Sequence, residues 1–103
     1  MGAIRSNALR NSAQGEACTL QIAGICCGDW STTVLAHLPS ETKGMGTKAD
    51  DLSACYACGA CHDLIDRHVW KLPDADWYMR RAMERTWRRL LEKGILTLKG
   101  QKS

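Results

Sequence analysis

The sequence predicts a single small domain of the α+β class that is stabilised by a zinc ion. A chain of 103 residues has the size of one domain and can bury roughly two-thirds of its unfolded surface. A β-branched segment precedes two segments with helical periodicity, so both strands and helices are expected. Two pairs of cysteines, widely separated along the chain, offer the ligands for a structural metal.

The first half of the chain is predicted to hold a short strand between irregular segments. Residues 1–16 are polar and are expected to form a loose arm with one helical turn. Residues 17–26 alternate partly and contain a glycine, a pattern typical of a short hairpin or a knuckle. Residues 32–37 are β-branched and apolar, which favours a strand with His37 at its end. The glycine-rich, basic residues 38–51 are expected to be a loop with room for one poor strand.

The second half is predicted to hold two helices. Residues 61–70 precede Pro73 and have apolar side chains on one side, which indicates a helix. Asp74 is a good N-cap for a second helix of about 20 residues, which Gly94 would end in the C′ position. Residues 95–98 are expected to form a terminal strand or an extension that packs on the core. The buried stripe of the long helix is predicted to be Met79, Met83, Trp87 and Leu90.

Charge and apolar content limit the cellular setting. The formal net charge of +3 permits a nucleic-acid partner without requiring one. No apolar run is long enough to span a membrane, and the amino terminus lacks the continuous apolar segment of a signal peptide. We therefore expect a reducing cytoplasm, where the six cysteines are metal ligands or free thiols rather than disulfides. The sequence leaves the oligomeric state open.

Four of the cysteines have the spacing of a structural zinc site. Cys18 and Cys26 are separated by seven residues, Cys58 and Cys61 by two, and the pairs lie about 30 residues apart. Such pairs tie two distant loops together around one tetrahedral ion. The two remaining cysteines are rivals for this ligand set: Cys27 for Cys26, and Cys55, which also begins a CxxC, for Cys58.

The cysteines allow three other interpretations. All six could be buried free thiols. Cys58-Gly59-Ala60-Cys61-His62 has the attachment pattern of c-type haem, with His62 as axial ligand, but that chemistry requires export. Cys55, Cys58 and Cys61 begin like a ferredoxin cluster, yet no cysteine follows them. Zinc with four thiolates accounts for more of the pattern and leaves His62 available for another role.

His37 and His62 are candidates for a second, catalytic site. If zinc takes four sulfur atoms, His62 begins a rigid helix, and Asp66 lies four residues on, on the same face. A histidine–carboxylate pair with open positions suits Mg²⁺, Mn²⁺ or a second Zn²⁺. His37 is the candidate general base that takes a proton from water in phosphodiester hydrolysis. The plainer interpretation is that His37 is an ordinary hydrogen-bonded residue and that Asp66 pairs with Arg67.

The order of these motifs resembles the treble-clef ββα-metal finger of the HNH (His-Me) nucleases. In that family a strand ends in the base histidine, matched by His37. A helix then opens directly after a CxxC, and the next residue, matched by His62, binds the catalytic cation. Residues 14–68 resemble more closely still the YbcO-like predicted nucleases of lambdoid phages and prophages. The runs that carry this resemblance are Cys18-Thr-Leu-Gln-Ile-Ala-Gly-Ile-Cys26, Thr32-Thr-Val-Leu-Ala-His37 and Cys58-Gly-Ala-Cys-His-Asp-Leu-Ile-Asp-Arg67.

The resemblance implies an architecture, an activity and a setting. It implies a zinc-stapled ββα-metal finger over residues 17–72, preceded by the polar arm (1–16) and followed by an amphipathic helix and tail (73–103) packed on the finger. It also implies endonuclease activity on DNA, with structural zinc and a catalytic Mg²⁺, Mn²⁺ or second Zn²⁺. The setting would be a phage or prophage protein in the cytoplasm of a bacterial host.

Two departures from the family pattern concern the catalytic cation and the base. Many HNH enzymes place an Asp or His metal ligand just before the base histidine, where this chain has Ala36. The central Asn that usually orients the base has no match at the expected spacing, and Asp51 is the nearest substitute. These departures favour an alternative function, a non-catalytic zinc module that binds DNA or another phage protein.

Two basic strips are candidates for DNA contact. Lys43 and Lys48 lie on the glycine-rich loop, where glycines let main-chain amides approach a phosphate backbone. Arg81, Arg85 and Arg88 form a basic face of the long helix. Neither strip has a base-reading pattern, so binding would be electrostatic and sensitive to salt. The plainer interpretation of the arginines is a solvated helix face.

Overall fold

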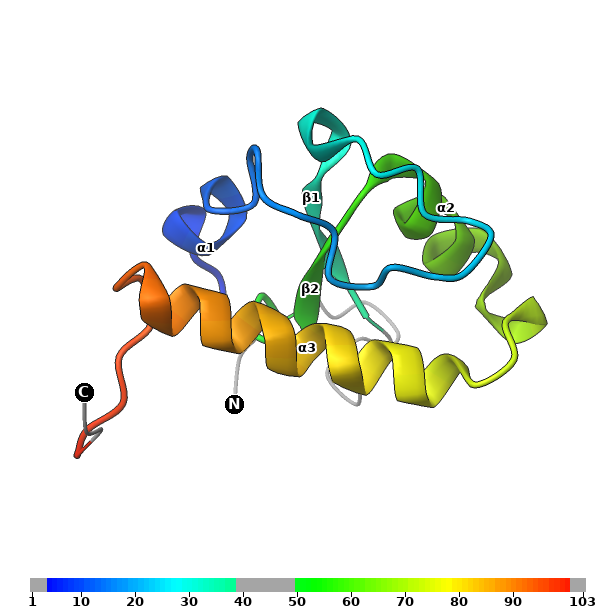
Figure 1. Ribbon diagram of the computed structural model, residues 1–103. Coiled ribbons are helices and arrows are strands. Elements are labelled where there is room, and N and C mark those ends of the chain that lie inside the picture. The colour runs from blue at the N-terminus through cyan, green and yellow to red at the C-terminus, as the bar shows by residue number, and fades with distance from the viewer. Residues whose placement is uncertain (1–3, 39–49, 101–103) are drawn as a thin grey trace.

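The structure is a computed structural model that describes residues 4–38 and 50–100. This part of the chain contains a two-stranded sheet and three α-helices, which confirms the expected α+β class. In Figure 1 the long helix α3 extends across the molecule beneath the strands, with α1 and α2 on either side of them. In chain order the elements are α1 (Asn7–Asn11), the 3₁₀ turn η1 (Trp30–Thr32), β1 (Val34–His37), β2 (Ala54–Ala57), α2 (Gly59–His68), the 3₁₀ turn η2 (Val69–Lys71) and α3 (Ala75–Glu92). No helix in the described ranges is long and apolar enough to cross a membrane.

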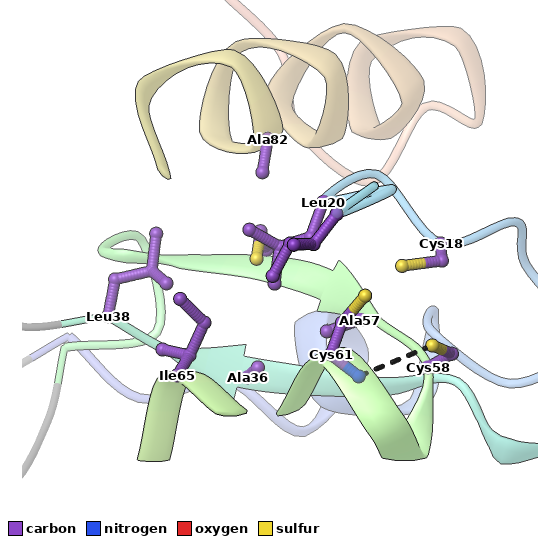
Figure 2. Packing of buried hydrophobic residues seen from close by; sticks show 11 residues of the cluster. Cys18, Leu20, Ala36, Leu38, Ala57, Cys58, Cys61, Ile65 and Ala82 are labelled. Atoms are coloured by element: carbon purple, nitrogen blue, oxygen red, sulfur yellow. Dashed lines mark hydrogen bonds between the residues drawn. The ribbon is translucent and has the colours of Figure 1, made fainter. Parts of the chain in front are cut away.

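The two strands sort their side chains into two buried clusters. β1 and β2 are antiparallel, with Leu35 opposite Tyr56, and successive side chains of a strand point to opposite faces. The side chains on one face of the sheet pack into a group that we call the Tyr56 cluster, formed by Leu9, Ala13, Leu35, Tyr56 and Leu90. The other lies in the main cluster, which includes Leu20, Ala36, Leu38, Cys55, Ala57, Ile65 and Ala82 (Figure 2).

The outer edge of β2 is closed by side chains from α3 and from the segment after α1. The Tyr56 amide donates to Thr86 Oγ1 at 3.0 Å, and the Tyr56 carbonyl accepts from the Thr19 amide and the Thr19 hydroxyl, each at 2.8 Å. The two threonine hydroxyl oxygens are 3.0 Å apart. All three residues are buried, so these edge groups of β2 are satisfied without a third strand.

Replacing Thr86 with valine is expected to destabilise the fold by about 1–3 kcal/mol, because the Tyr56 amide would stay buried without an acceptor. Urea unfolding followed by circular dichroism measures the change in unfolding free energy. The matched control is Thr97→Val, in the exposed segment after α3, which should change stability by less than about 0.5 kcal/mol. Equal stability of the two variants would contradict this role for Thr86.

The helix ends agree closely with the prediction, but one predicted cap is absent. α2 begins at Gly59, two residues earlier than expected. α3 begins at Ala75 as expected, yet Asp74 has left-handed backbone (φ 59°) and its side chain makes no cap hydrogen bond. An N-cap residue normally needs extended backbone for its side-chain oxygen to reach the amides of the first turn. Gly94 has φ 73° and its amide donates to the Leu91 carbonyl at 3.1 Å, as predicted for C′.

The buried line of α3 differs from the predicted stripe. Trp87 is 38% exposed, and its indole Nε1 donates to the Leu52 carbonyl at 3.1 Å. Met79 and Met83 are half-buried and pack against the main cluster. The side chains that α3 buries completely are Ala82, Thr86 and Leu90. The small side chains at the first two of these positions let the helix approach β2 closely, which leaves the bulky indole at the rim of the contact.

The N-terminal segment is packed, whereas the sequence predicted a loose arm. The predicted single turn is present as α1, in which Ser6 Oγ accepts from the Leu9 amide at 3.2 Å. Leu9 and Ala13 are buried in the Tyr56 cluster. Ser12 Oγ lies 2.7 Å from the Tyr56 hydroxyl oxygen. Leu9, on α1, and Ala13, in the turn that follows α1, together dock this segment on the sheet.

Three further predictions concern irregular segments. Residues 17–26 form a knuckle and not a hairpin, and the Cys26 amide donates to the Ile22 carbonyl at 2.9 Å. Residues 95–98 form no strand, but their first two side chains pack against the Tyr56 cluster. The predicted glycine-rich loop falls largely on residues 39–49, outside the described residues.

Candidate metal centre and histidine site

Four cysteine side chains meet between the knuckle and the start of α2. The Sγ atoms of Cys18, Cys26, Cys58 and Cys61 all lie within 4.8 Å of one another. Four thiolates bound tetrahedrally to zinc at about 2.3 Å have sulfur atoms about 3.8 Å apart. The Sγ atoms of Cys26 and Cys58 are 3.9 Å apart. The donor set and its geometry therefore fit zinc, and the structure brings together the four cysteines that their spacing selected.

Local backbone geometry directs these thiols toward one another. Cys58 is the N-cap of α2, and its Sγ accepts from the Cys61 amide at 3.5 Å, the dashed line in Figure 2. In the knuckle, the Gln21 amide donates to Cys18 Sγ at 3.5 Å. The left-handed backbone of Gln21 (φ 44°) makes this turn possible. Hydrogen bonds from amides to sulfur favour the thiolate form, which is the form that binds metal.

The thiols of the cluster differ in acidity. A hydrogen bond from the Cys61 thiol, together with backbone hydrogen bonds, lowers the pKa of Cys18 to about 4 although burial opposes this. The pKa of Cys61 is raised, because its thiol is the donor to Cys18 and because it is buried. Cys18 therefore offers a thiolate at neutral pH, and binding of a cation would release protons from the Cys26 and Cys61 thiols, whose pKa values are raised.

The two other cysteines stand outside the cluster. Cys27 is exposed, and its Sγ lies 3.8 Å from Thr32 Oγ1. Cys55 is fully buried on β2, and burial, reinforced by the negative charge at Cys18, raises its pKa to about 12. A thiol with that pKa is a neutral core residue at physiological pH. The structure thus separates both rivals from the ligand set that their spacing had left open.

His37 is held by a buried carboxylate. His37 Nε2 lies 2.7 Å from Asp51 Oδ1, and the Asp51 side chain has 0% exposure. The other carboxylate oxygen, Oδ2, accepts from the Ser6 amide at 2.6 Å and from Arg10 Nε at 3.2 Å. Burial raises the pKa of Asp51, but the hydrogen bonds from His37, Ser6 and Arg10 outweigh it and bring the pKa below its ordinary value. An ionised Asp51 accepts a hydrogen bond from the N–H at His37 Nε2, and in the neutral ring the lone pair is then on Nδ1.

Sequence reasoning found only part of this site. The sequence indicates Asp51 only as the nearest substitute for the central Asn of HNH enzymes, and the structure places it in contact with His37. Ser6 and Arg10 were not singled out. They lie 45 and 41 residues before Asp51, and no local pattern links a polar arm to an aspartate at that distance.

His37 and Ala36 lie on opposite faces of the sheet, because successive side chains of a strand alternate. His37 has the same parity on β1 as Leu35, so it lies on the face of the sheet that carries the Tyr56 cluster. Ala36 lies on the face that packs against α2, and it is fully buried. Ala36, at the position where many HNH enzymes have a metal ligand, therefore contributes to the core.

The proposed cation ligands lie on α2. His62 is half-buried and Asp66 is exposed. Because α2 packs on the face of the sheet opposite to His37, the described structure does not gather His37 with these two side chains. Arg67 pairs with Asp63 at 3.0 Å, not with Asp66 as the plainer interpretation held. Within the described residues, the four cysteines are the only group of three or more His, Cys, Asp or Glu side chains gathered closely enough to hold a metal.

The predicted DNA-contacting residues have different surroundings. Lys43 and Lys48 lie outside the described residues. Arg81 donates from Nη2 to the Leu20 carbonyl at 2.8 Å and stacks over Trp77, with 4.5 Å from its Cζ to the ring centroid. Arg85 and Arg88 are exposed, and Arg85 Nη1 donates to Gln21 Oε1 at 3.1 Å. Two of the three arginines therefore brace the knuckle that carries Cys18.

Comparison with known proteins finds relatives over most of the chain. The family described as "Putative nuclease YbcO" matches residues 7–95. Proteins of that name from Escherichia coli strain K12 and from Enterobacteria phage 82 are each 44% identical over 77 residues, which cover 74% of this chain and 79% of the relative. A solved structure of "a putative bacteriophage protein" from Escherichia coli K-12 MG1655 superposes with a TM-score of 0.65 at 37% identity, covering 84% of this chain and 100% of that chain.

Proposed function

The chain belongs to the YbcO family, and we propose on that premise that it is a metal-dependent endonuclease that hydrolyses DNA phosphodiester bonds. The proposal includes a treble-clef ββα-metal core of the HNH (His-Me) type and structural zinc on the four cysteines. The observation that carries it is the hydrogen bond between His37 and the buried Asp51. A histidine oriented by a carboxylate is the usual arrangement of a general base.

His37 would act through Nδ1. Its Nε2 is occupied by Asp51 Oδ1 at 2.7 Å, so the free lone pair belongs to the other ring nitrogen. The side chain is 28% exposed, which gives a water molecule access to the ring. Nδ1 would take the proton as that water attacks the scissile phosphorus, and Asp51 would stabilise the charged imidazolium that forms.

His62 and Asp66 are the proposed ligands of the catalytic cation. They lie four residues apart on α2 and therefore share a helical face. The exposure of Asp66 leaves positions open to water and to substrate. A bound Mg²⁺, Mn²⁺ or second Zn²⁺ would supply positive charge to the scissile phosphate. The four-cysteine site takes all its ligands from the protein and is proposed to be structural.

Basic side chains are proposed to contact the DNA backbone. Arg88 is exposed on α3 and is the clearest candidate among the described residues. Lys43 and Lys48 are proposed from the sequence alone. Arg81 and Arg85 already bond the knuckle, so we assign their larger role to positioning that segment. Binding through such contacts weakens steeply as salt concentration rises.

A specific observation supports the alternative function. Ala36, at the position where many HNH enzymes have a metal ligand, is fully buried in the main cluster. A zinc module that binds DNA or a phage protein without cleaving it needs no ligand there. The two functions differ in whether a divalent cation converts binding into cleavage.

Incubation of supercoiled plasmid with the protein tests the proposed function. We expect conversion to the nicked form when Mg²⁺, Mn²⁺ or Zn²⁺ is added, and none without added cation. His62→Ala should need at least about ten-fold more cation for the same rate, because it removes a ligand. The control is His68→Ala, a histidine at the end of α2 whose ring packs edge-on against Trp70. If the protein binds the plasmid at low salt but cleaves it with none of these cations, the non-catalytic binding module is favoured.

A further inference from the structure

The N-terminal segment contacts Asp51 through three groups. The Asp51 amide donates to the Ile4 carbonyl at 2.8 Å, which pairs the two backbones directly. The Ser6 amide and Arg10 Nε both bond to Asp51 Oδ2, at 2.6 and 3.2 Å. The remaining oxygen, Oδ1, bonds to His37. The buried Asp51 carboxylate thus bonds to the N-terminal segment through one oxygen and to His37 through the other.

This division fixes the orientation of the carboxylate. An aspartate held through one oxygen can rotate about its last side-chain bond, whereas bonds to both oxygens in different directions remove that freedom. This segment is packed on the domain, since Leu9 of α1 and Ala13 just after α1 are buried in the Tyr56 cluster. Orientation of Asp51 Oδ1 toward His37 therefore depends on contacts made by α1.

We propose that the N-terminal segment is part of the catalytic site, in which Arg10 and the Ser6 amide are positioning groups that hold Asp51 so that His37 keeps its proton on Nε2 and its lone pair on Nδ1. The inference rests on the proposed function for its catalytic consequence only. The positioning itself is a property of the folded protein and is measurable without substrate. The competing explanation is that Arg10 merely attaches the arm to the domain.

Arg10→Gln and Arg10→Lys separate these explanations. Glutamine removes the charge and the geometry of the guanidinium, whereas lysine restores a cationic donor to Asp51. Arg5→Gln is the matched control, because it removes the same charge from an exposed position of the same segment. Nitrogen-15 spectra of the His37 ring report which ring nitrogen carries the proton, and thermal unfolding reports attachment of the arm.

In wild type and Arg5→Gln we expect a single form of His37 with the proton on Nε2. Arg10→Gln should show a mixture of the two tautomers, and Arg10→Lys should restore the single form in large part. In the nicking assay, kcat of Arg10→Gln should fall about ten-fold with KM unchanged, because the base is misplaced while DNA contacts remain. An unchanged tautomer and unchanged kcat, with only a lower melting temperature, would overturn the proposal.

The same experiments distinguish failure of the positioning proposal from failure of the proposed endonuclease function. If wild type nicks no DNA but Arg10→Gln alters the tautomer of His37, the endonuclease assignment fails and the positioning stands. If His37 is required for nicking but Arg10→Gln changes neither the tautomer nor kcat, the endonuclease assignment stands and the positioning proposal fails.

Discussion

Complete removal of the proposed zinc ion from the four-cysteine site is expected to unfold the chain. Zinc binding contributes of order 10 kcal/mol to folding in small metal-bound domains, which is comparable with the whole stability of a domain, about 5–15 kcal/mol. Here the ligands join the knuckle to α2 inside the main cluster, so their loss would open the core. Loss of helical circular dichroism and of the cooperative thermal transition after chelation would show this. Cys61→Ser should have the same effect without a chelator.

The neighbouring thiol provides the matched control. Cys27 adjoins Cys26 in sequence but is exposed and lies outside the ligand set. Cys27→Ser should therefore keep one zinc per chain, measured by titration of the thiols with a metal indicator present, and should keep the melting temperature. Unchanged circular dichroism after complete metal loss would contradict a structural role for the site. A coloured protein as purified would instead favour haem or an iron–sulfur cluster.

His37→Ala is expected to lower the rate of plasmid nicking by roughly 10²–10⁴-fold, the usual contribution of a general base. The reason is that the substitution removes the proposed proton acceptor, which Asp51 holds at 2.7 Å. His37→Gln sharpens the test, because its amide can still donate to Asp51 Oδ1 while it offers no basic nitrogen. We expect both variants to lose activity and His37→Gln to retain near wild-type stability. Initial rates on supercoiled plasmid, with stability measured in parallel, provide the comparison.

Equal cleavage by wild type and His37→Ala would show that the base assignment is wrong. Recovery of activity in His37→Gln alone would indicate that His37 serves mainly to hold Asp51. A protein that binds the plasmid with the same salt dependence in all three forms, and cleaves in none, would fit the binding module.

Local patterns predicted most of the secondary structure. β-branched residues indicated the strand that ends in His37, and apolar spacing before Pro73 indicated α2 to within two residues at its start. Gly94 was predicted to follow the long helix in the C′ position, and α3 ends at Glu92 with Lys93 as C-cap and Gly94 at C′. Each of these features depends on residues a few positions apart, so it is encoded without reference to the rest of the fold. The N-cap predicted at Asp74 failed because its backbone is left-handed.

The sequence by itself thus determined β1, the two longer helices, the family and the pool of possible metal ligands. It did not determine β2 (Ala54–Ala57), which follows the segment where a second strand was expected. Only the tertiary structure decided which side chains meet. It selected Cys26 over the adjacent Cys27, and it packed Thr86 rather than Trp87 against β2. It also brought an N-terminal arginine to an aspartate 41 residues away. Contacts of this kind depend on how helices and strands pack against one another. That packing joins residues far apart in the sequence, so no local or periodic sequence pattern predicts it.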